Sequence, residues 1–186
     1  MPSSNPDAPN ASGLAANETK ALEERSIQPH EESIIQSIKE MYTCKPKQST
    51  YEIYSKDAVF HDPIGIANGK DSIIAQFNAL AKIFPKADIP KFRLLQNPSS
   101  VPSSTLLIDQ DVAYYRNPDK EPTKVVNSLL TLETSSGLVT RHTEEWDHRH
   151  EPASGDGFFG FLNEQRKKAT AAMTDMFTSK EPPKKE

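Results

Sequence analysis

Apolar residues recur at helical spacing in two stretches of the first half of the chain. In residues 31–43 they lie three or four positions apart until Pro46, and in residues 70–84 they do so until Pro85. Because proline cannot continue a helix, both stretches are predicted to be helices that end before these prolines and bury one face. Residues 49–55 form a shorter helical candidate. The buried stripes are expected at Ile34, Ile35, Ile38, Met41 and Tyr42, and at Ile73, Ile74, Phe77, Leu80, Ala81 and Phe84.

After Pro85 the apolar period changes to two, which is the alternation of a β-strand. Strands are predicted at residues 89–96, 105–116, 124–134 and 138–148, in addition to a short one with the sequence AVFHD at 58–62. Gly65 and the Asn68–Gly69 pair are typical of turns. Helices followed by one antiparallel sheet predict an α+β fold, with the N-terminal helices packed on the concave side of a strongly curved, cone-shaped sheet. Such a sheet leaves a cavity that can bind a ligand.

The two ends of the chain differ from its middle. Residues 1–28 are rich in Pro, Ser, Asn, Ala and Glu and contain few large aliphatic residues, so we expect a disordered tail there and another at 179–186. Residues 29–150 are predicted to form the domain. Residues 151–178 are expected to form a loop and a helix, at about 158–177, that pack on the domain and cap the mouth of its cavity.

Charge and composition narrow the range of partners. The chain has 186 residues, a net charge of −4 and no long basic block, which argues against a nucleic-acid partner. Its single cysteine, Cys44, excludes an internal disulfide and fits a reducing compartment. No apolar stretch approaches the roughly 18 residues of a membrane span. The N-terminus lacks the features of a secretory signal. We therefore predict a cytoplasmic protein that binds neither nucleic acid nor membrane, and a homodimer is compatible with these observations.

Asp62 is the first candidate for chemistry. It lies between the apolar strand that contains Phe60 and the Pro63–Gly65 break, where an Asp residue commonly starts a turn. Phe60 and Asp62 share one face of the strand, so if Phe60 points into the core, Asp62 does too. A carboxylate in an apolar cavity suits proton transfer. Asp62 is thus either a turn residue or a base that faces a cavity.

The last predicted strand carries a second group of polar residues. Alternation places His142, Glu144, Trp146 and His148 on one face, and Trp146 is expected to mark the buried side. His142 and Glu144 then form either a structural hydrogen-bonded pair or part of a polar cavity wall. A metal site is not expected, because His142 and His148 lie roughly 20 Å apart along a strand.

Tyrosine hydroxyls are further candidate hydrogen-bond donors to a cavity. Tyr42, Tyr51 and Tyr54 could supply them, although tyrosines at this spacing are commonly part of an amphipathic core. The sequence contains no Gly-rich motif long enough for phosphate binding. It therefore predicts neither a metal nor a cofactor.

The order of these motifs resembles the nuclear transport factor 2-like (NTF2-like) superfamily over roughly residues 30–150. The run YSKDAVFHDPIG at 54–65, followed by Asn68-Gly69-Lys70 and a helix, carries the first part of the resemblance. The run GLVTRHTEEWD at 137–147 is similar to the final strand of a SnoaL-like subgroup with ligand pockets. The superfamily also includes ketosteroid isomerases and polyketide cyclases, and its fold is a cone.

The resemblance to ketosteroid isomerases implies roles for individual residues. Their general base would correspond to Asp62, their oxyanion-hole tyrosine to Tyr42 and their cavity-lining tryptophan to Trp146. Their second oxyanion donor is a protonated acid, and the matching place is near Asn127–Ser128, which contains no acid. Ser128 could donate a hydrogen bond there.

Three functions are compatible with the sequence. The favoured one is a module that binds a small apolar or carbonyl-containing molecule, with Phe60, Tyr54, Glu144, Trp146 and Ser128 as ligand-binding residues. The second is an acid–base enzyme, an isomerase, cyclase or dehydratase for a ketone or polyketide-like substrate. In that enzyme Asp62 is the base, Tyr42 a donor and His142 a proton partner. The third is an interaction protein that uses the outer face of the sheet.

Overall fold

The computed structural model describes residues 8–151, 157–158, 160–165 and 167. Its helices confirm the two long helical predictions to within one or two residues. The described residues from 157 to 167 are helical as well. The helical elements are α1 (Ala16–Ala21), η1 (Pro29–Glu31), α2 (Glu32–Tyr42), η2 (Gln48–Ile53) and α3 (Lys70–Ile83), of which η1 and η2 are 3-10 helices.

The strands form a single mixed sheet with the order β2-β1-β6-β5-β4-β3. Strands β3 to β6 pair with their sequence neighbours in the antiparallel direction, as predicted, whereas β1 and β6 run parallel. Antiparallel pairing follows from short connections, but β1 reaches β6 only through α3 and four strands, so no hairpin fixes its direction. The strands are β1 (Tyr54–Asp62), β2 (Gly65–Asn68), β3 (Lys86–Leu94), β4 (Thr105–Tyr115), β5 (Lys124–Ser135) and β6 (Leu138–Trp146).

Strand β2 was predicted only as turn sequence. It pairs with β1 in a tight hairpin in which Asp62 lies opposite Gly65, and it forms one edge of the sheet. The chain still turns at both ends of β2, as the sequence predicts. Gly69 has a φ of 83° where the chain leaves β2 and enters α3, a conformation that favours glycine.

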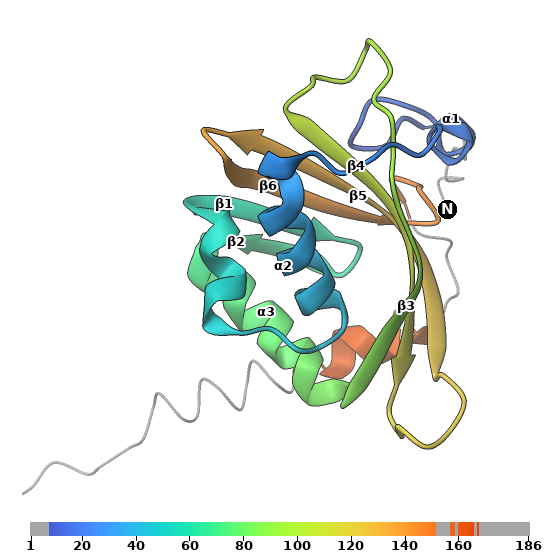
Figure 1. Ribbon diagram of the computed structural model, residues 1–186. Coiled ribbons are helices and arrows are strands. Elements are labelled where there is room, and N and C mark those ends of the chain that lie inside the picture. Colours follow the sequence, from blue (N-terminus) through green and yellow to red (C-terminus); the bar gives the residue numbers. More distant parts are fainter. Residues whose placement is uncertain (1–7, 152–156, 159, 166, 168–186) are drawn as a thin grey trace, which may run out of the picture.

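Helices α2 and α3 cover one face of the sheet, and the long strands β4 and β5 curve around them (Figure 1). The main hydrophobic core lies between these layers. It includes the predicted stripes of both helices, except Ala81, and the residues of β4 to β6 that point toward them. This is the α+β arrangement that the sequence predicts.

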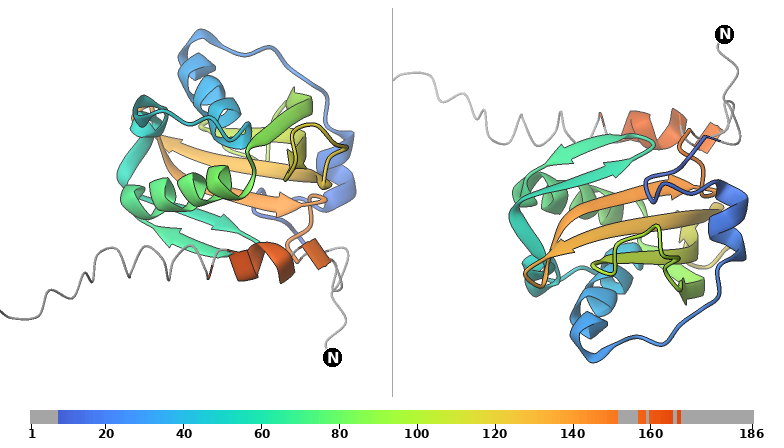
Figure 2. Two further views of the ribbon diagram at one scale, coloured as in Figure 1. Left: turned by 90° about the horizontal axis from the view of Figure 1, so that it is seen from below. Right: turned by 90° about the horizontal axis from the view of Figure 1, so that it is seen from above.

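The N-terminal segment, residues 8–28, covers the other face of the sheet. The predicted disordered tail is therefore wrong for these residues, and its remaining part, with residues 179–186, lies outside the described chain. In the right panel of Figure 2 the segment crosses the near side of the strands while α3 lies behind them. Glu24 forms a β-bridge with Leu95. Leu14 and Leu22 pack on a second cluster made by Leu95, Val101, Leu107 and Leu129.

Polar contacts hold this segment against the sheet. Its composition, with few large aliphatic residues, therefore did not predict that it packs on the domain. His148 is fully buried, and its ring lies 2.8 Å from Thr19 Oγ1 and 3.1 Å from Asp109 Oδ1. Asn10 donates a hydrogen bond to the backbone carbonyl of His148. The prediction that His148 shares a face with His142 is wrong, because β6 ends at Trp146 and His148 has a φ of 62°.

Candidate functional site

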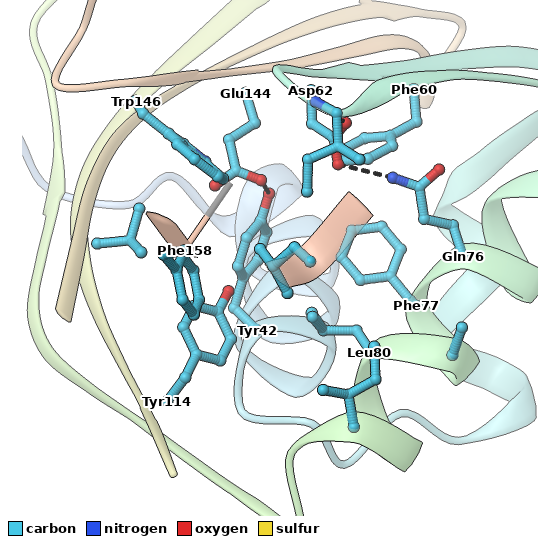
Figure 3. Close-up of a pocket in the computed structure, with 15 residues that line it drawn as sticks. Tyr42, Phe60, Asp62, Gln76, Phe77, Leu80, Tyr114, Glu144, Trp146 and Phe158 are labelled. Carbon is cyan, nitrogen blue, oxygen red and sulfur yellow. Dashed lines mark hydrogen bonds between the residues drawn. The ribbon is translucent and has the colours of Figure 1, made fainter. Parts of the chain in front are cut away.

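A cavity of about 60 Å³ opens on the helix side of the sheet (Figure 3). Its walls come from α2, α3, the end of β1, strands β4 to β6 and the C-terminal helix. Most of them are apolar, and the polar groups gather at the end formed by β1 and β6. The lining residues are Tyr42, Phe60, Asp62, Ile64, Gln76, Phe77, Ala79, Leu80, Ile83, Tyr114, Val126, Glu144, Trp146, Phe158 and Leu162.

Glu144 reaches this cavity from β6 because inward residues alternate along the strand. Its carboxyl group is buried, and Tyr42 donates a hydrogen bond of 2.8 Å to Oε2. Burial, and then the nearby charge of Asp62, raise the pKa of Glu144 to about 7. Glu144 therefore changes its charge near neutral pH.

His142 lies behind the cavity wall and does not line it. Its ring is fully buried among Tyr42, Tyr54, Phe60 and Phe77. Burial lowers the pKa of His142 to about 3, so the imidazole is neutral at physiological pH. The sequence suggested that His142 exchanges a proton with a ligand. A neutral imidazole that does not reach the cavity does not suit this role.

Tyr54, His142, Tyr42 and Glu144 form one chain of buried hydrogen bonds. Tyr54 Oη lies 2.7 Å from His142 Nδ1, and His142 Nε2 lies 3.3 Å from Tyr42 Oη. The single hydroxyl proton of Tyr42 goes to the Glu144 carboxylate, so Nε2 must be the ring nitrogen that carries hydrogen. The expected direct pair of His142 and Glu144 is therefore bridged by Tyr42.

Asp62 combines the two roles that the sequence left open. Its Oδ1 accepts hydrogen bonds from the backbone N–H groups of Ile64 and Gly65, which is an Asx turn, at 2.9 and 2.8 Å. Its Oδ2 accepts a hydrogen bond of 2.7 Å from Gln76 (Figure 3). The same carboxylate lines the cavity. Asp62 thus holds the β1–β2 corner and faces the site together with Glu144.

The aromatic side chains enclose the opposite part of the cavity. Phe158 of the C-terminal helix packs against Phe84, Tyr114 and Trp146, with ring centroids 6.1 to 6.2 Å apart. Leu162, one turn further along, also lines the cavity. The described part of this helix therefore closes one side of the cavity. The predicted helix beyond residue 167 lies outside the described residues.

The predicted site residues divide into two groups. Asp62, Tyr42, Phe60, Glu144 and Trp146 meet around the cavity, whereas His142, Tyr54 and Ser128 lie behind its wall. Ser128 is fully buried on β5, directly opposite Trp146. It does not supply a group to the cavity itself.

Sequence reasoning missed two polar residues of the site. Gln76 lies on α3 between Ile73 and Leu80, so its helical spacing placed it on the buried stripe. Tyr114 lies on β4 and points inward by alternation with Val112, and burial raises its pKa well above the usual value. Within the described chain no hydrogen-bond partner meets the Tyr114 hydroxyl.

Two further features of the described residues bear on function. They contain no group of three or more His, Cys, Asp or Glu side chains that could hold a metal ion. In the same part of the chain no helix has the length and apolar character needed to cross a membrane.

Comparison with known proteins identifies the fold. A scan against protein-family models and a search of curated proteins found no match. A steroid delta-isomerase from Pseudomonas aeruginosa is similar in structure, with a TM-score of 0.54 and 10% identity over 80% of this chain and 96% of the isomerase. An NTF2-like protein from Anabaena variabilis has a TM-score of 0.53 and 12% identity over 66% of this chain and 93% of its own. The chain therefore has the NTF2-like fold.

Proposed function

We propose that the protein binds a small, mainly apolar molecule in the cavity, with a carbonyl or similar polar group directed toward Asp62 and Glu144. The observation that carries this proposal is the uneven distribution of polarity. Two carboxyl groups lie at one end of a cavity whose other walls are aromatic and aliphatic. Ligand sites commonly combine such walls with a few placed polar groups that fix orientation.

The two carboxyl groups have different surroundings. Asp62 accepts three hydrogen bonds from N–H donors, an arrangement that suits an ionised carboxylate. Glu144 has a pKa raised to about 7, so below that pH it carries a proton that it can donate to a carbonyl oxygen. A polar ligand group at this end would therefore meet one acceptor and one donor.

The cavity can be tested by filling it. Ala79 lines the cavity from α3, and the Ala79→Phe variant should abolish the backbone amide shifts that acetophenone causes in the wild type at pH 6. Lys82→Phe adds the same ring to an exposed position of the same helix and should leave them unchanged. Equal shifts in wild type and Ala79→Phe, with both variants folded, would refute binding in this cavity.

A second candidate function is acid–base catalysis on an enolisable ketone, with Asp62 as the base. The favouring observation is the pair of carboxyl groups that face one cavity, one of them able to donate a proton near neutral pH. The likeness to a steroid delta-isomerase supports the fold of such an enzyme and no more.

Proton exchange tests this second candidate directly. The wild type should accelerate exchange of deuterium into the methyl group of acetophenone, and Asp62→Asn should abolish the acceleration while the protein remains folded. An acceleration that persists in Asp62→Asn, or none in the wild type when acetophenone is bound, would exclude Asp62 as a catalytic base.

A further inference from the structure

Gln110 carries a fully buried amide group in the middle of β4. Neither its Nε2 nor its Oε1 has a hydrogen-bond partner within the described chain. Almost all buried polar groups in native proteins are paired, because a buried group without a partner loses its hydrogen bonds with water and gains none in return. Two unpaired atoms on one fully buried side chain therefore indicate a partner from outside the folded chain, such as a ligand or a water molecule.

This side chain lies on the face of the sheet that α2 and α3 cover. Ile108 and Val112, two positions before and after Gln110, belong to the main core between helices and sheet. Leu107 belongs to the cluster on the other face. Because side chains alternate along a strand, Gln110 points to the same side of the sheet as the cavity does.

Gln110 also lies next to the part of the sheet that forms the cavity floor. It pairs with Ser128 on β5, and Ser128 pairs with Trp146 on β6, which lines the cavity. Neighbouring strands are about 5 Å apart, so the backbones of Gln110 and Trp146 are separated by roughly 10 Å. Val126, one inward position from Ser128 along β5, lines the cavity as well. The buried amide is therefore a close neighbour of the cavity without being part of its wall.

Ligand binding has to enlarge the cavity. Its volume is about 60 Å³, whereas ligand pockets usually have roughly 300–1,000 Å³. Enlargement into the apolar core separates side chains that pack against one another, and their contacts are lost. Enlargement toward Gln110 instead exposes an amide group that forms no hydrogen bond with its neighbours, and a polar ligand group then supplies one. A ligand with a suitably placed polar group therefore gains most in this direction.

We propose that Gln110 is a specificity-determining residue of the cavity, and that its amide binds a hydroxyl group on a small cyclic or aromatic ketone. This inference rests on the proposed ligand-binding function and narrows the ligand class to carbonyl compounds with a second polar group. The amide donates through Nε2 and accepts through Oε1. A hydroxyl group both donates and accepts, so it can satisfy either atom of the amide.

Matched pairs of ligands test this proposal. The meta and para isomers of hydroxyacetophenone carry the hydroxyl group, and the same isomers of methylacetophenone have a methyl group in its place. In a site without a polar partner the methyl compounds bind more tightly, because a buried hydroxyl loses its hydrogen bonds with water. With Gln110 as the partner, at least one hydroxyl isomer should bind roughly three- to tenfold more tightly than its methyl counterpart. NMR titration of the backbone amides at pH 6 measures the affinities.

Variants assign the preference to Gln110. Gln110→Met keeps the length of the side chain without its amide, and it should abolish the preference for hydroxyl over methyl. The free variant should melt at the wild-type temperature or above, because no hydrogen bond is lost. Thr131→Val is the matched control. Thr131 Oγ1 is also buried without a hydrogen-bond partner in the described chain, but Thr131 lies opposite Leu107 on the other face of the sheet. This control should keep the wild-type preference.

The outcomes separate this inference from the proposed function. A preference that persists in Gln110→Met, or that the wild type lacks although it binds acetophenone, would overturn the role of Gln110 and leave the proposed function standing. A melting temperature that falls in both Gln110→Met and Gln110→Leu would show that the amide is already paired in the free protein, for example with an enclosed water, and would overturn the role as well. If acetophenone and all its derivatives fail to shift the cavity residues, the ligand-binding function falls, and this inference falls with it.

Discussion

The hydroxyl of Tyr42 lies 2.8 Å from Glu144 Oε2 and 3.3 Å from His142 Nε2, so one buried tyrosine joins the cavity carboxyl group to a histidine outside the cavity. Tyr42 commits its proton to Glu144. It is therefore a residue that positions the carboxyl group, rather than a free donor to a ligand as the resemblance to isomerases implied.

The tautomer of His142 follows from this arrangement. Nε2 should carry the hydrogen and Nδ1 should accept the Tyr54 hydroxyl proton, because the alternative leaves two lone pairs facing each other at Tyr42. Nitrogen-15 NMR should show a neutral, Nε2-protonated ring from pH 5 to 8, with the signal assigned by its loss in His142→Gln. A ring protonated at Nδ1, or one that becomes charged in this range, would contradict the hydrogen-bond chain.

Glu144 should make the protein less stable as pH rises. Its pKa is about 7 in the folded state against 4.5 for an ordinary glutamate, so its contribution is complete below pH 4.5 and is lost as pH rises through 7. The loss amounts to about 3 kcal/mol. Urea denaturation at pH 5 and pH 8 should show this difference in the wild type and a smaller one in Glu144→Gln. Equal pH dependence in both proteins would contradict the burial of an ionisable Glu144.

The charge of Asp62 should contribute to the raised pKa of Glu144. Removing its charge in Asp62→Asn should lower the pKa of Glu144 below about 7, because the nearby carboxylate is the second cause of the elevation. The asparagine oxygen can still accept the backbone N–H groups of Ile64 and Gly65, so the turn is retained. Carbon-13 NMR of the Glu144 carboxyl group measures the shift. An unchanged or higher pKa would show that the two groups do not interact.

The N-terminal segment should depend on its polar anchors. Thr19→Val removes the hydrogen bond to buried His148 at nearly constant volume and should cost about 1–3 kcal/mol of unfolding free energy. Hydrogen exchange of residues 10–25 should accelerate in the same variant. Lys20→Ala removes only an exposed ion pair with Asp147 and should change stability by less than about 1 kcal/mol. Similar effects of the two substitutions would contradict the buried anchor.

The C-terminal helix should shield the cavity from solvent. Trp146 is the only tryptophan, so its fluorescence reports this wall. Phe158→Ala should increase the quenching of Trp146 by acrylamide, because Phe158 packs against it in the cavity wall. Phe161 does not line the cavity, and Phe161→Ala should have a smaller effect. Unchanged quenching in Phe158→Ala would mean that the helix does not close this side.

Periodicity predicted the elements that bury one continuous apolar face. The stripes of α2 and α3 and the alternation of β4 to β6 are of this kind, and the inward position of Glu144 follows from the same alternation. The resemblance around Asp62 predicted the cone-like fold. These patterns involve residues that lie close together along the chain, so they can be recognised in a single sequence.

The features that sequence missed depend on contacts between distant segments. The N-terminal segment is held by buried polar groups such as Thr19 and His148 rather than by an apolar stripe. The parallel pairing of β1 with β6 depends on how the chain crosses the sheet. Tyr42, Glu144 and Asp62 meet only after folding, so the raised pKa of Glu144 could not be read from spacing.

The position of bound acetophenone tests the central claim most directly. At pH 6, nuclear Overhauser effects between the ligand ring and methyl groups should appear at Leu80 and Val126, which line the cavity. They should be absent at Leu107 and Leu129, which lie in the cluster on the other face of the sheet. Contacts to Leu80 and Val126, with none to Leu107 or Leu129, are the predicted result. Contacts to Leu107 or Leu129, or no contacts with a saturating ligand, would contradict a ligand site in this cavity.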